Sequence, residues 1–402
     1  MNKFVKRTML AVPPIKRRYE ELVNLRKDNE QLRLQISHLS SHINRFNNTY
    51  DDLVDSLWNN DKRDKWTCTA PFENMLIYPK GEIGVCCGKY LTPQMLIIGN
   101  ALTNSFDSVW NSDKLKRLRY SVSMGNFEYC KKKCHGIVNP KIFASTIERN
   151  YDNYNYAKWQ DCSLDTSPTK IQLWIDDTCN LRCASCRNHL RVKTNAECEQ
   201  IATILENFVR PAIKNCTEIM ALGSGEFFAS KPTVNFFKTL SKSEFPQLKI
   251  VIQTNAILLT PKKWDELSNL KGMVGRVRVS CDGAKKETYE KLRGGASWEI
   301  FCENMEYISS LRSSGEIDDL VLAFVVQKDN YSEIVDFVLL AKKWRVDKLS
   351  FMVLENYGTY TESEYNDKNV LLPENAFYEE AARTLKRMEK ENTDIVFFIE
   401  GF

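Results

Sequence analysis

Three cysteines in one short segment are the residues whose type and spacing point most directly to chemistry. Cys179, Cys183 and Cys186 follow each other in the spacing CxxxCxxC. Three thiolates from one loop can bind three corners of a cubane iron–sulfur cluster and leave the fourth iron open to another ligand. A zinc site needs four closed ligands, and the next cysteine, Cys198, is expected on the following helix. The spacing therefore predicts an iron–sulfur cluster with one exchangeable iron.

A second group of cysteines lies upstream of this loop. Cys68, Cys86, Cys130 and Cys134 supply four thiols, and Cys87 could take the place of Cys86. Four thiolates suit a [4Fe–4S] cluster and a structural zinc ion equally well, so the spacing alone leaves both open.

The 13 cysteines contrast with only 4 histidines, which argues against a histidine-rich metal site. The odd cysteine count, the absence of a signal-peptide pattern and the lack of any run of 18 apolar residues favour reduced thiols in the cytoplasm. A net charge of +4 gives no reason to expect nucleic acid. The remaining cysteines are expected to be buried as small apolar side chains: Cys162, Cys198, Cys216, Cys281 and Cys302.

The elements that must position the CxxxCxxC loop alternate regularly from residue 168 onward. Short apolar segments typical of strands are each followed by a segment typical of a helix. Six such units predict an α/β fold with a parallel sheet, a partial (β/α)6 TIM-like barrel. Chemistry in such folds lies at the carboxyl ends of the strands. The loops to inspect therefore follow residues 175, 221, 253, 280, 326 and 354.

The region before residue 168 divides into three parts. Residues 15–58 carry an unbroken heptad seam with one polar position, Asn29, which predicts a coiled coil for self-association or partner binding. An amphipathic helix packed on its own domain is the alternative. The predicted limits are a helix or coiled coil over 1–60, a small α+β domain over 61–140, a connector over 141–167 and the barrel over 168–402.

Further motifs stand at the expected strand ends. They are Gly223-Ser-Gly-Glu226, Gln253-Thr254-Asn255, Ser280-Cys-Asp282-Gly, Arg293 and the strand end at Val326. With CxxxCxxC they make the chain resemble radical S-adenosylmethionine (SAM) enzymes. The resemblance implies that Glu226 contacts the SAM amino group, that Ser280 and Arg293 reach its carboxylate, and that backbone near Val326 lines the adenine. It also places Gly223, Gly225, Thr254, Asn255 and Asp282 in the cofactor site.

This sequence departs from the family pattern at three positions. Ser185 stands where the family often has an aromatic residue, Ser224 interrupts the Gly-Gly-Glu motif, and Ala256 replaces a glycine. None of the three removes a cluster ligand or the carboxylate.

The upstream cysteines resemble a second family. Cys68, Gly81 and Cys86 fit C-x12-G-x4-C, and the segment that ends in Cys130 and Cys134 is similar to the SPASM domain or its one-cluster form, twitch. The resemblance favours a second, auxiliary [4Fe–4S] cluster over zinc. This domain usually follows the barrel, whereas here it precedes it.

The resemblance implies reductive cleavage of SAM to a 5′-deoxyadenosyl radical that abstracts hydrogen from a substrate, with a reductant such as flavodoxin or ferredoxin. We expect a small, carbohydrate-type substrate, with a peptide as the alternative. Strand alternation turns Arg276 and Arg278 inward, toward an anionic substrate or toward buried carboxylates. An iron–sulfur scaffold or electron-transfer protein and a zinc-binding coiled-coil protein are the non-enzyme alternatives. The sequence names no catalytic acid, base or hydrogen donor.

Overall fold

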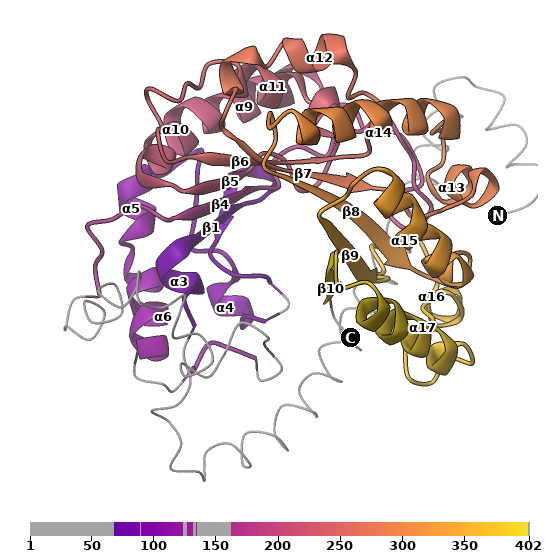
Figure 1. Cartoon of the computed structure of the whole chain (residues 1–402). Helices are drawn as coiled ribbons and strands as arrows, with labels where there is room; N and C mark the ends of the chain where they lie inside the picture. Colours follow the sequence, from indigo (N-terminus) through magenta and orange to yellow (C-terminus); the bar gives the residue numbers. More distant parts are fainter. Residues whose placement is uncertain (1–67, 89, 124–126, 132–133, 135–161, 401–402) are drawn as a thin grey trace, which may run out of the picture. The chain divides into compact units, whose positions relative to one another are not determined.

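The computed structural model describes residues 68–88, 90–123, 127–131, 134 and 162–400, all within one compact unit, Lys65–Phe402. A ten-stranded sheet runs through this unit in the order β10-β9-β8-β7-β6-β5-β4-β1-β2-β3 (Figure 1). The predicted coiled coil of residues 15–58 and most of the predicted connector lie outside the described residues.

Seven parallel strands, β4 to β10, form the barrel part of the sheet. Their inner and outer faces alternate as predicted: in β7, Val277 and Val279 are buried, whereas Arg276, Arg278 and Ser280 are partly exposed. The strands are β4 (Lys170–Leu173), β5 (Glu218–Met220), β6 (Lys249–Thr254), β7 (Val274–Ser280), β8 (Asp319–Val326), β9 (Lys348–Val353) and β10 (Val396–Glu400).

Helices between successive strands cover the outer face of this sheet (Figure 1). They bury apolar side chains such as Phe337, which packs against Phe324 and Phe351 of the strands. This arrangement confirms the predicted partial α/β barrel. None of the described helices is long and apolar enough to span a membrane. The main helices are α9 (Asn195–Ile204), α11 (Lys231–Phe237), α12 (Pro261–Asp265), α13 (Lys286–Leu292), α14 (Trp298–Ser313), α15 (Ile334–Lys343), α16 (Glu362–Lys368) and α17 (Tyr378–Glu391).

The segment before the barrel adds three strands to the same sheet. β1 pairs in parallel with β4, from Asn74 opposite Lys170 to Ile77 opposite Leu173. β2 and β3 then continue the sheet in antiparallel fashion. The predicted limits 61–140 and 168–402 therefore fall within one continuous sheet and stay predictions. The elements are α3 (Ala70–Glu73), β1 (Asn74–Ile77), β2 (Glu82–Gly84), α4 (Pro93–Leu96), β3 (Gly99–Asn100), α5 (Phe106–Trp110) and α6 (Asp113–Ser123).

Two helices differ from the sequence expectation for identifiable reasons. Residues 104–125, with an Asn/Ser/Asp start and a Gly stop, read in the sequence as a single helix. The structure breaks this segment into α5 and α6 at Asn111, whose side-chain oxygen accepts hydrogen bonds from the Leu164 amide (2.9 Å) and the Arg119 guanidinium (3.0 Å). Helix α16 was not expected. It begins with a capping box of Thr361 and Glu364 and buries none of its residues, so it lacks the apolar periodicity that signals a helix.

Candidate functional site

The CxxxCxxC segment forms the loop between β4 and α9, at the carboxyl end of the first barrel strand. Backbone hydrogen bonds fasten it to the segment after α13: the Arg182 amide donates to the Gly294 carbonyl (2.9 Å) and the Ala184 amide to the Leu292 carbonyl (3.1 Å). Cys183 is buried, Cys179 is partly exposed and Cys186 is exposed. The loop backbone is thus held by hydrogen bonds, and its three thiols differ in their exposure to solvent.

A guanidinium lies against these thiols. Nε and Nη2 of Arg187 each donate to the Cys186 sulfur at 3.4 Å. Burial lowers the pKa of Arg187, but Cys186, Cys179 and Cys183 outweigh it and the pKa is raised. All three thiols therefore act electrostatically on this one cation. No sequence motif pointed to Arg187, whose only signal is that a basic residue directly follows the third cysteine.

Glu226 connects the second and third motifs. Its side chain is only 1% exposed, and its two oxygens accept hydrogen bonds from the Thr254 hydroxyl (2.8 Å) and from the amides of Asn255 (2.7 Å) and Phe228 (3.2 Å). Burial raises the pKa of Glu226, although these hydrogen bonds and the charge of Arg293 oppose the rise. Because a carboxylate offers about four acceptor positions, one is left for a further donor.

Asn255 connects Glu226 and Thr254 to the cysteine loop. Its amide nitrogen donates to the Asn180 side chain at 2.9 Å and lies 3.9 Å from the Cys179 sulfur. The Cys179 thiol also feels the Glu226 charge, which raises its pKa after the larger effect of burial. Glu226, Thr254 and Asn255 therefore meet beside the first cysteine.

Gly223 and Gly225 allow the second motif to lie this close. A Cβ on Gly225 would stand 2.4 Å from the Thr178 carbonyl oxygen, and one on Gly223 would stand 2.8 Å from the Trp174 ring. Both approaches are too short for any other residue. These glycines let their loop pack against the cysteine loop, and their place in the cofactor site stays a prediction.

Arg293 carries the next motif to Cys183. Its Nη1 donates to the Cys183 sulfur at 3.3 Å, and its Nε pairs with the Asp282 carboxylate at 3.2 Å. Burial lowers the pKa of Arg293, but Asp282 and Cys183 raise it by more. Its Nη2 is buried without a hydrogen-bond partner. Such an orphaned donor suits a carboxylate ligand.

Asp282 also fastens the ends of two strands, because its carboxylate accepts from the Val325 amide at 2.7 Å. Ser280 and Val326 stand at the carboxyl ends of β7 and β8. No hydrogen bond or ion pair of the described residues joins either of them to the cysteine loop. The structure thus brings together the thiols, Glu226, Thr254, Asn255, Asp282 and Arg293, whereas Ser280 is partly exposed and Val326 is buried at their strand ends.

These residues fit the cofactor that the resemblance implies. SAM carries an ammonium and a carboxylate on one carbon, and the site offers a buried carboxylate, Glu226, and a guanidinium with buried nitrogens, Arg293, beside the thiols. Three thiols from one loop leave the fourth corner of a cluster open between them.

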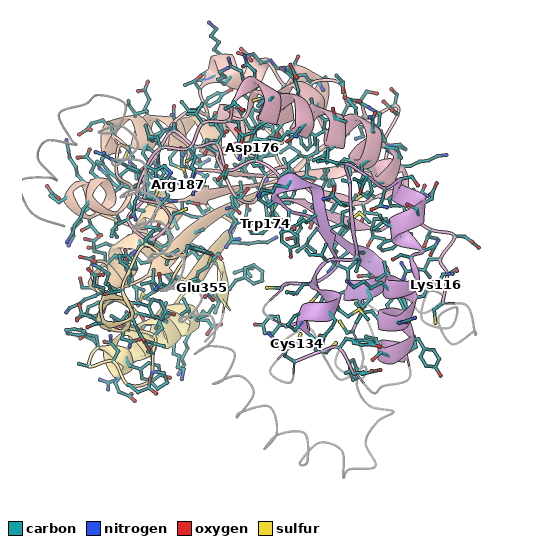
Figure 2. The ribbon with its side chains drawn as sticks, turned by 180° about the vertical axis from the view of Figure 1, so that it is seen from behind. Lys116, Cys134, Trp174, Asp176, Arg187 and Glu355 are labelled. Atoms are coloured by element: carbon teal, nitrogen blue, oxygen red, sulfur yellow. The ribbon has the colours of Figure 1, made fainter. Side chains whose placement is uncertain are left out.

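The four upstream thiols also gather in one place. Electrostatic influence links every pair among Cys68, Cys86, Cys130 and Cys134. Burial and these like neighbours raise the pKa of Cys68 to about 11 and those of Cys86 and Cys130 to about 12. In Figure 2, Cys134 lies in the violet part of the ribbon, away from Arg187 and Asp176. The two thiol groups are therefore separate sites.

The structure separates Cys86 from its neighbour Cys87. Cys86 is partly buried and interacts with all three other thiols, whereas Cys87 is exposed and acts on Cys86 and Tyr78. The geometry favours Cys86 as the fourth ligand. Among the described residues, no three His, Cys, Asp or Glu side chains are grouped as ligands of a single metal ion.

The two inward arginines differ, and only Arg276 is seen near carboxylates, which are partly exposed rather than buried. Arg276 lies 3.8 Å from the Glu218 carboxylate and 3.6 Å from that of Asp319. Arg278 donates to the Ser350 hydroxyl at 2.7 Å. Of the five cysteines expected to be buried, Cys198 and Cys302 are partly exposed; the other three are buried: Cys162, Cys216 and Cys281.

Comparison with known proteins supports both resemblances. Residues 175–341 match the radical SAM superfamily, and residues 68–135 match SPASM, an iron–sulfur cluster-binding domain. No curated protein sequence matches the chain.

Several solved structures are similar in part. Streptococcus suis SuiB bound to S-adenosylmethionine is 17% identical, with a TM-score of 0.44 over 65% of this chain and 60% of that one. Native anSMEcpe with bound AdoMet is 15% identical, with a TM-score of 0.39 over 57% and 64%. BtrN in complex with AdoMet and 2-DOIA is 16% identical, with a TM-score of 0.26 over 40% and 57%. The chain thus spans less than two thirds of each of these proteins.

The two matched domains coincide with the two groups of thiols. The domains imply a SAM-binding [4Fe–4S] cluster at the CxxxCxxC loop, SAM itself, and an auxiliary iron–sulfur cluster upstream. The chain carries a radical SAM domain over residues 175–341, preceded by a SPASM domain over residues 68–135.

Proposed function

We propose that this protein is a radical SAM enzyme, in which SAM and the core cluster together supply a 5′-deoxyadenosyl radical for hydrogen abstraction. The convergence of Glu226 and Arg293 on the CxxxCxxC thiols carries the proposal. An iron–sulfur scaffold or an electron-transfer protein has no need of a buried carboxylate and a buried guanidinium beside an open cluster corner.

Each residue has a defined task in this proposal. Cys179, Cys183 and Cys186 hold the core cluster. Glu226 binds the SAM ammonium, and the unpartnered Nη2 of Arg293 binds the SAM carboxylate. Thr254, Asn255 and Asp282 orient these two side chains through the hydrogen bonds and the ion pair described above. Ser280 also reaches the SAM carboxylate, and backbone near Val326 lines the adenine, as the resemblance implies.

The four upstream thiols, Cys68, Cys86, Cys130 and Cys134, hold an auxiliary [4Fe–4S] cluster in this proposal. Their mutual proximity supports it, and the match to an iron–sulfur cluster-binding domain favours iron over zinc. A low-potential reductant such as flavodoxin or ferredoxin would supply the electron for SAM cleavage.

For the substrate we propose a peptide before a small molecule. β10 is an edge strand: among the described strands it pairs only with β9, and its Val396 and Phe398 are exposed. An exposed strand edge can pair with an extended peptide. SuiB has been solved with its precursor peptide SuiA, and anSMEcpe with the Kp18Cys peptide, whereas BtrN has been solved with 2-DOIA. No described residue favours the carbohydrate-type substrate expected from the sequence.

Anaerobic reconstitution tests the enzyme proposal. The reconstituted protein should bind about eight irons per chain, as two [4Fe–4S] clusters require, and should release 5′-deoxyadenosine from SAM and dithionite. Iron without SAM cleavage would support the scaffold instead, and bound zinc without a visible chromophore would support the zinc-binding alternative. Deuterium transfer into 5′-deoxyadenosine from deuterated peptide or sugar libraries then separates the two substrate classes.

A further inference from the structure

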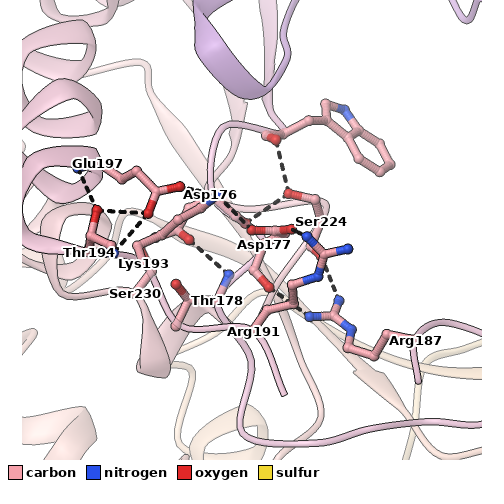
Figure 3. A network of polar contacts seen from close by, with 11 residues as sticks. Asp176, Asp177, Thr178, Arg187, Arg191, Lys193, Thr194, Glu197, Ser224 and Ser230 are labelled. Atoms are coloured by element: carbon pink, nitrogen blue, oxygen red, sulfur yellow. Dashed lines mark hydrogen bonds and ion pairs between the residues drawn. The ribbon is translucent and has the colours of Figure 1, made fainter. Parts of the chain in front are cut away.

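The Arg187 side chain joins three parts of the core site. Its Nη1 donates to the Asp177 carbonyl at 2.6 Å and its Nη2 to the Ser224 carbonyl at 2.9 Å (Figure 3). Its Nε and Nη2 both donate to the Cys186 sulfur. The guanidinium therefore spans the cysteine loop and the Gly223–Glu226 loop. No motif in the sequence assigns it a task.

The surrounding network keeps this guanidinium in place. The Ser224 hydroxyl lies within hydrogen-bond distance of the carbonyls of Trp174 (2.9 Å) and Asp176 (2.8 Å) and can donate its proton to either, which holds the Ser224 carbonyl toward Arg187. The Asp177 side chain takes no part in this, because its carboxylate pairs with Arg191 (3.2 Å) and Lys193 (2.9 Å), as Figure 3 shows. Ser224, which interrupts the family motif, thus takes part in holding Arg187.

Hydrogen bonds to a cluster's sulfur ligands are one of the protein's means of setting its reduction potential. A positive group that donates N–H···S bonds stabilises the more negative, reduced form and so raises the potential. Cys186 is the most exposed of the three ligands, where competing water would otherwise be the donor. A planar fork can give two such bonds at once, whereas a lysine cannot.

We propose that Arg187 is a positioning residue that donates two hydrogen bonds to the Cys186 thiolate and thereby raises the reduction potential of the core cluster. This inference rests on the proposed function, because it requires the cluster at the CxxxCxxC loop. The electron comes from an external low-potential reductant, and no bond at Arg187 is made or broken.

The test is a potentiometric EPR measurement on the reconstituted full chain, in which the core signal is identified by its change when SAM is added. Arg187→Gln should lower the reduction potential of the core cluster by ~59 mV, which corresponds to a tenfold change in the one-electron reduction equilibrium. Arg187→Lys, which keeps the charge without the fork, should fall between Arg187→Gln and the unmodified protein. Arg191→Gln is the matched control, because Arg191 contacts Asp177 on the same loop through its side chain but no thiol, and it should leave the potential unchanged.

The outcomes separate the inference from the proposed function. A full-length protein whose core signal does not respond to SAM overturns the proposed function. A responsive protein in which Arg187→Gln matches Arg191→Gln overturns the role of Arg187 alone. If Arg187→Gln binds no core iron, Arg187→Lys decides: a potential below that of the unmodified protein supports the inference, and an equal one overturns it.

Discussion

The two thiol sites of this chain differ in the charges that surround their sulfur atoms. At the core loop, guanidinium groups donate hydrogen bonds to the sulfurs: Arg187 to Cys186 and Arg293 to Cys183. At the auxiliary site, the groups among the described residues that shift the pKa values of Cys68, Cys86 and Cys130 include no cation. Burial and mutual repulsion dominate there instead.

The difference concerns the cost of making thiolates. Each pKa unit corresponds to about 1.4 kcal/mol, so the auxiliary thiols, with pKa values near 11 and 12, are held protonated at neutral pH. Metal must displace those protons before it can bind. At the core loop burial also raises the pKa of Cys179, but the charge of Arg187 opposes the rise. We therefore expect the core site to form its cluster more readily than the auxiliary site.

The largest expected effect breaks the comparison by removing one ligand from each site. Cys183→Ala should abolish SAM cleavage and remove about four irons, whereas Cys86→Ala should remove about four irons and leave SAM cleavage in place. Iron analysis and 5′-deoxyadenosine assays measure both. Cys87→Ala is the control for Cys86→Ala and should retain all the iron. SAM cleavage that survives Cys183→Ala would refute the core assignment.

A smaller effect is expected from the buried carboxylate that the core site alone possesses. Glu226→Gln replaces an acceptor by a donor among three existing donors, which should destabilise the protein by about 1–3 kcal/mol and weaken SAM binding. Thr254→Val removes only one of these hydrogen bonds and should cost about 1 kcal/mol. Urea unfolding and SAM titration measure the two changes. Equal losses in both variants would argue against Glu226 as the centre of the network.

The pH dependence of the metal-free protein sharpens the auxiliary half of the comparison. Because the folded-state pKa values of Cys68, Cys86 and Cys130 exceed the unfolded value of 9.0, the folded state holds protons that the unfolded state loses. Their contribution is complete below pH 9 and should disappear as the pH rises through 11 to 12. Urea midpoints measured from pH 8 to 11 should fall, and more gently in Cys86→Ala. Parallel curves for the two proteins would contradict the assignment.

The smallest effect probes the backbone of the core site. Ala256 is buried at φ 65°, a left-handed conformation that costs a non-glycine residue about 1–2 kcal/mol. Ala256→Gly should relieve this, less about 0.4–1 kcal/mol for the greater freedom of the unfolded chain. Ala323→Gly, in the buried interior of β8, should instead destabilise. A loss of stability in Ala256→Gly would contradict the expected relief of backbone strain, since glycine keeps the backbone carbonyl that Asn304 contacts.

Much of the barrel could be predicted because its signals are local. The strands after residue 168 are apolar segments of ordinary length, and each motif follows a strand, so their meeting at one end follows from parallel topology. The two ligand groups could be proposed from spacing. The convergence of Glu226, Thr254 and Asn255 on Cys179 agrees with that expectation.

Other features had no local signal. The parallel pairing of β1 with β4 joins residues about 96 positions apart, and nothing in either strand names its partner. The choice of Cys86 over Cys87 depends on which side of a turn faces the other thiols. Arg187 resembles any surface arginine until Ser224 and Asp177 are seen around it. Tertiary contacts, rather than composition or periodicity, decide these three.

The pairing of β1 with β4 also aligns two segments that carry thiols. Ile77 stands opposite Leu173; from Leu173 the chain continues toward Cys179, whereas from Ile77 it turns back through β2 toward Cys86. A slip of one residue would shift one strand by about 3.3 Å and turn its side chains to the opposite face. The register of this one pair of strands therefore links the positions of Cys86 and Cys179 through backbone hydrogen bonds.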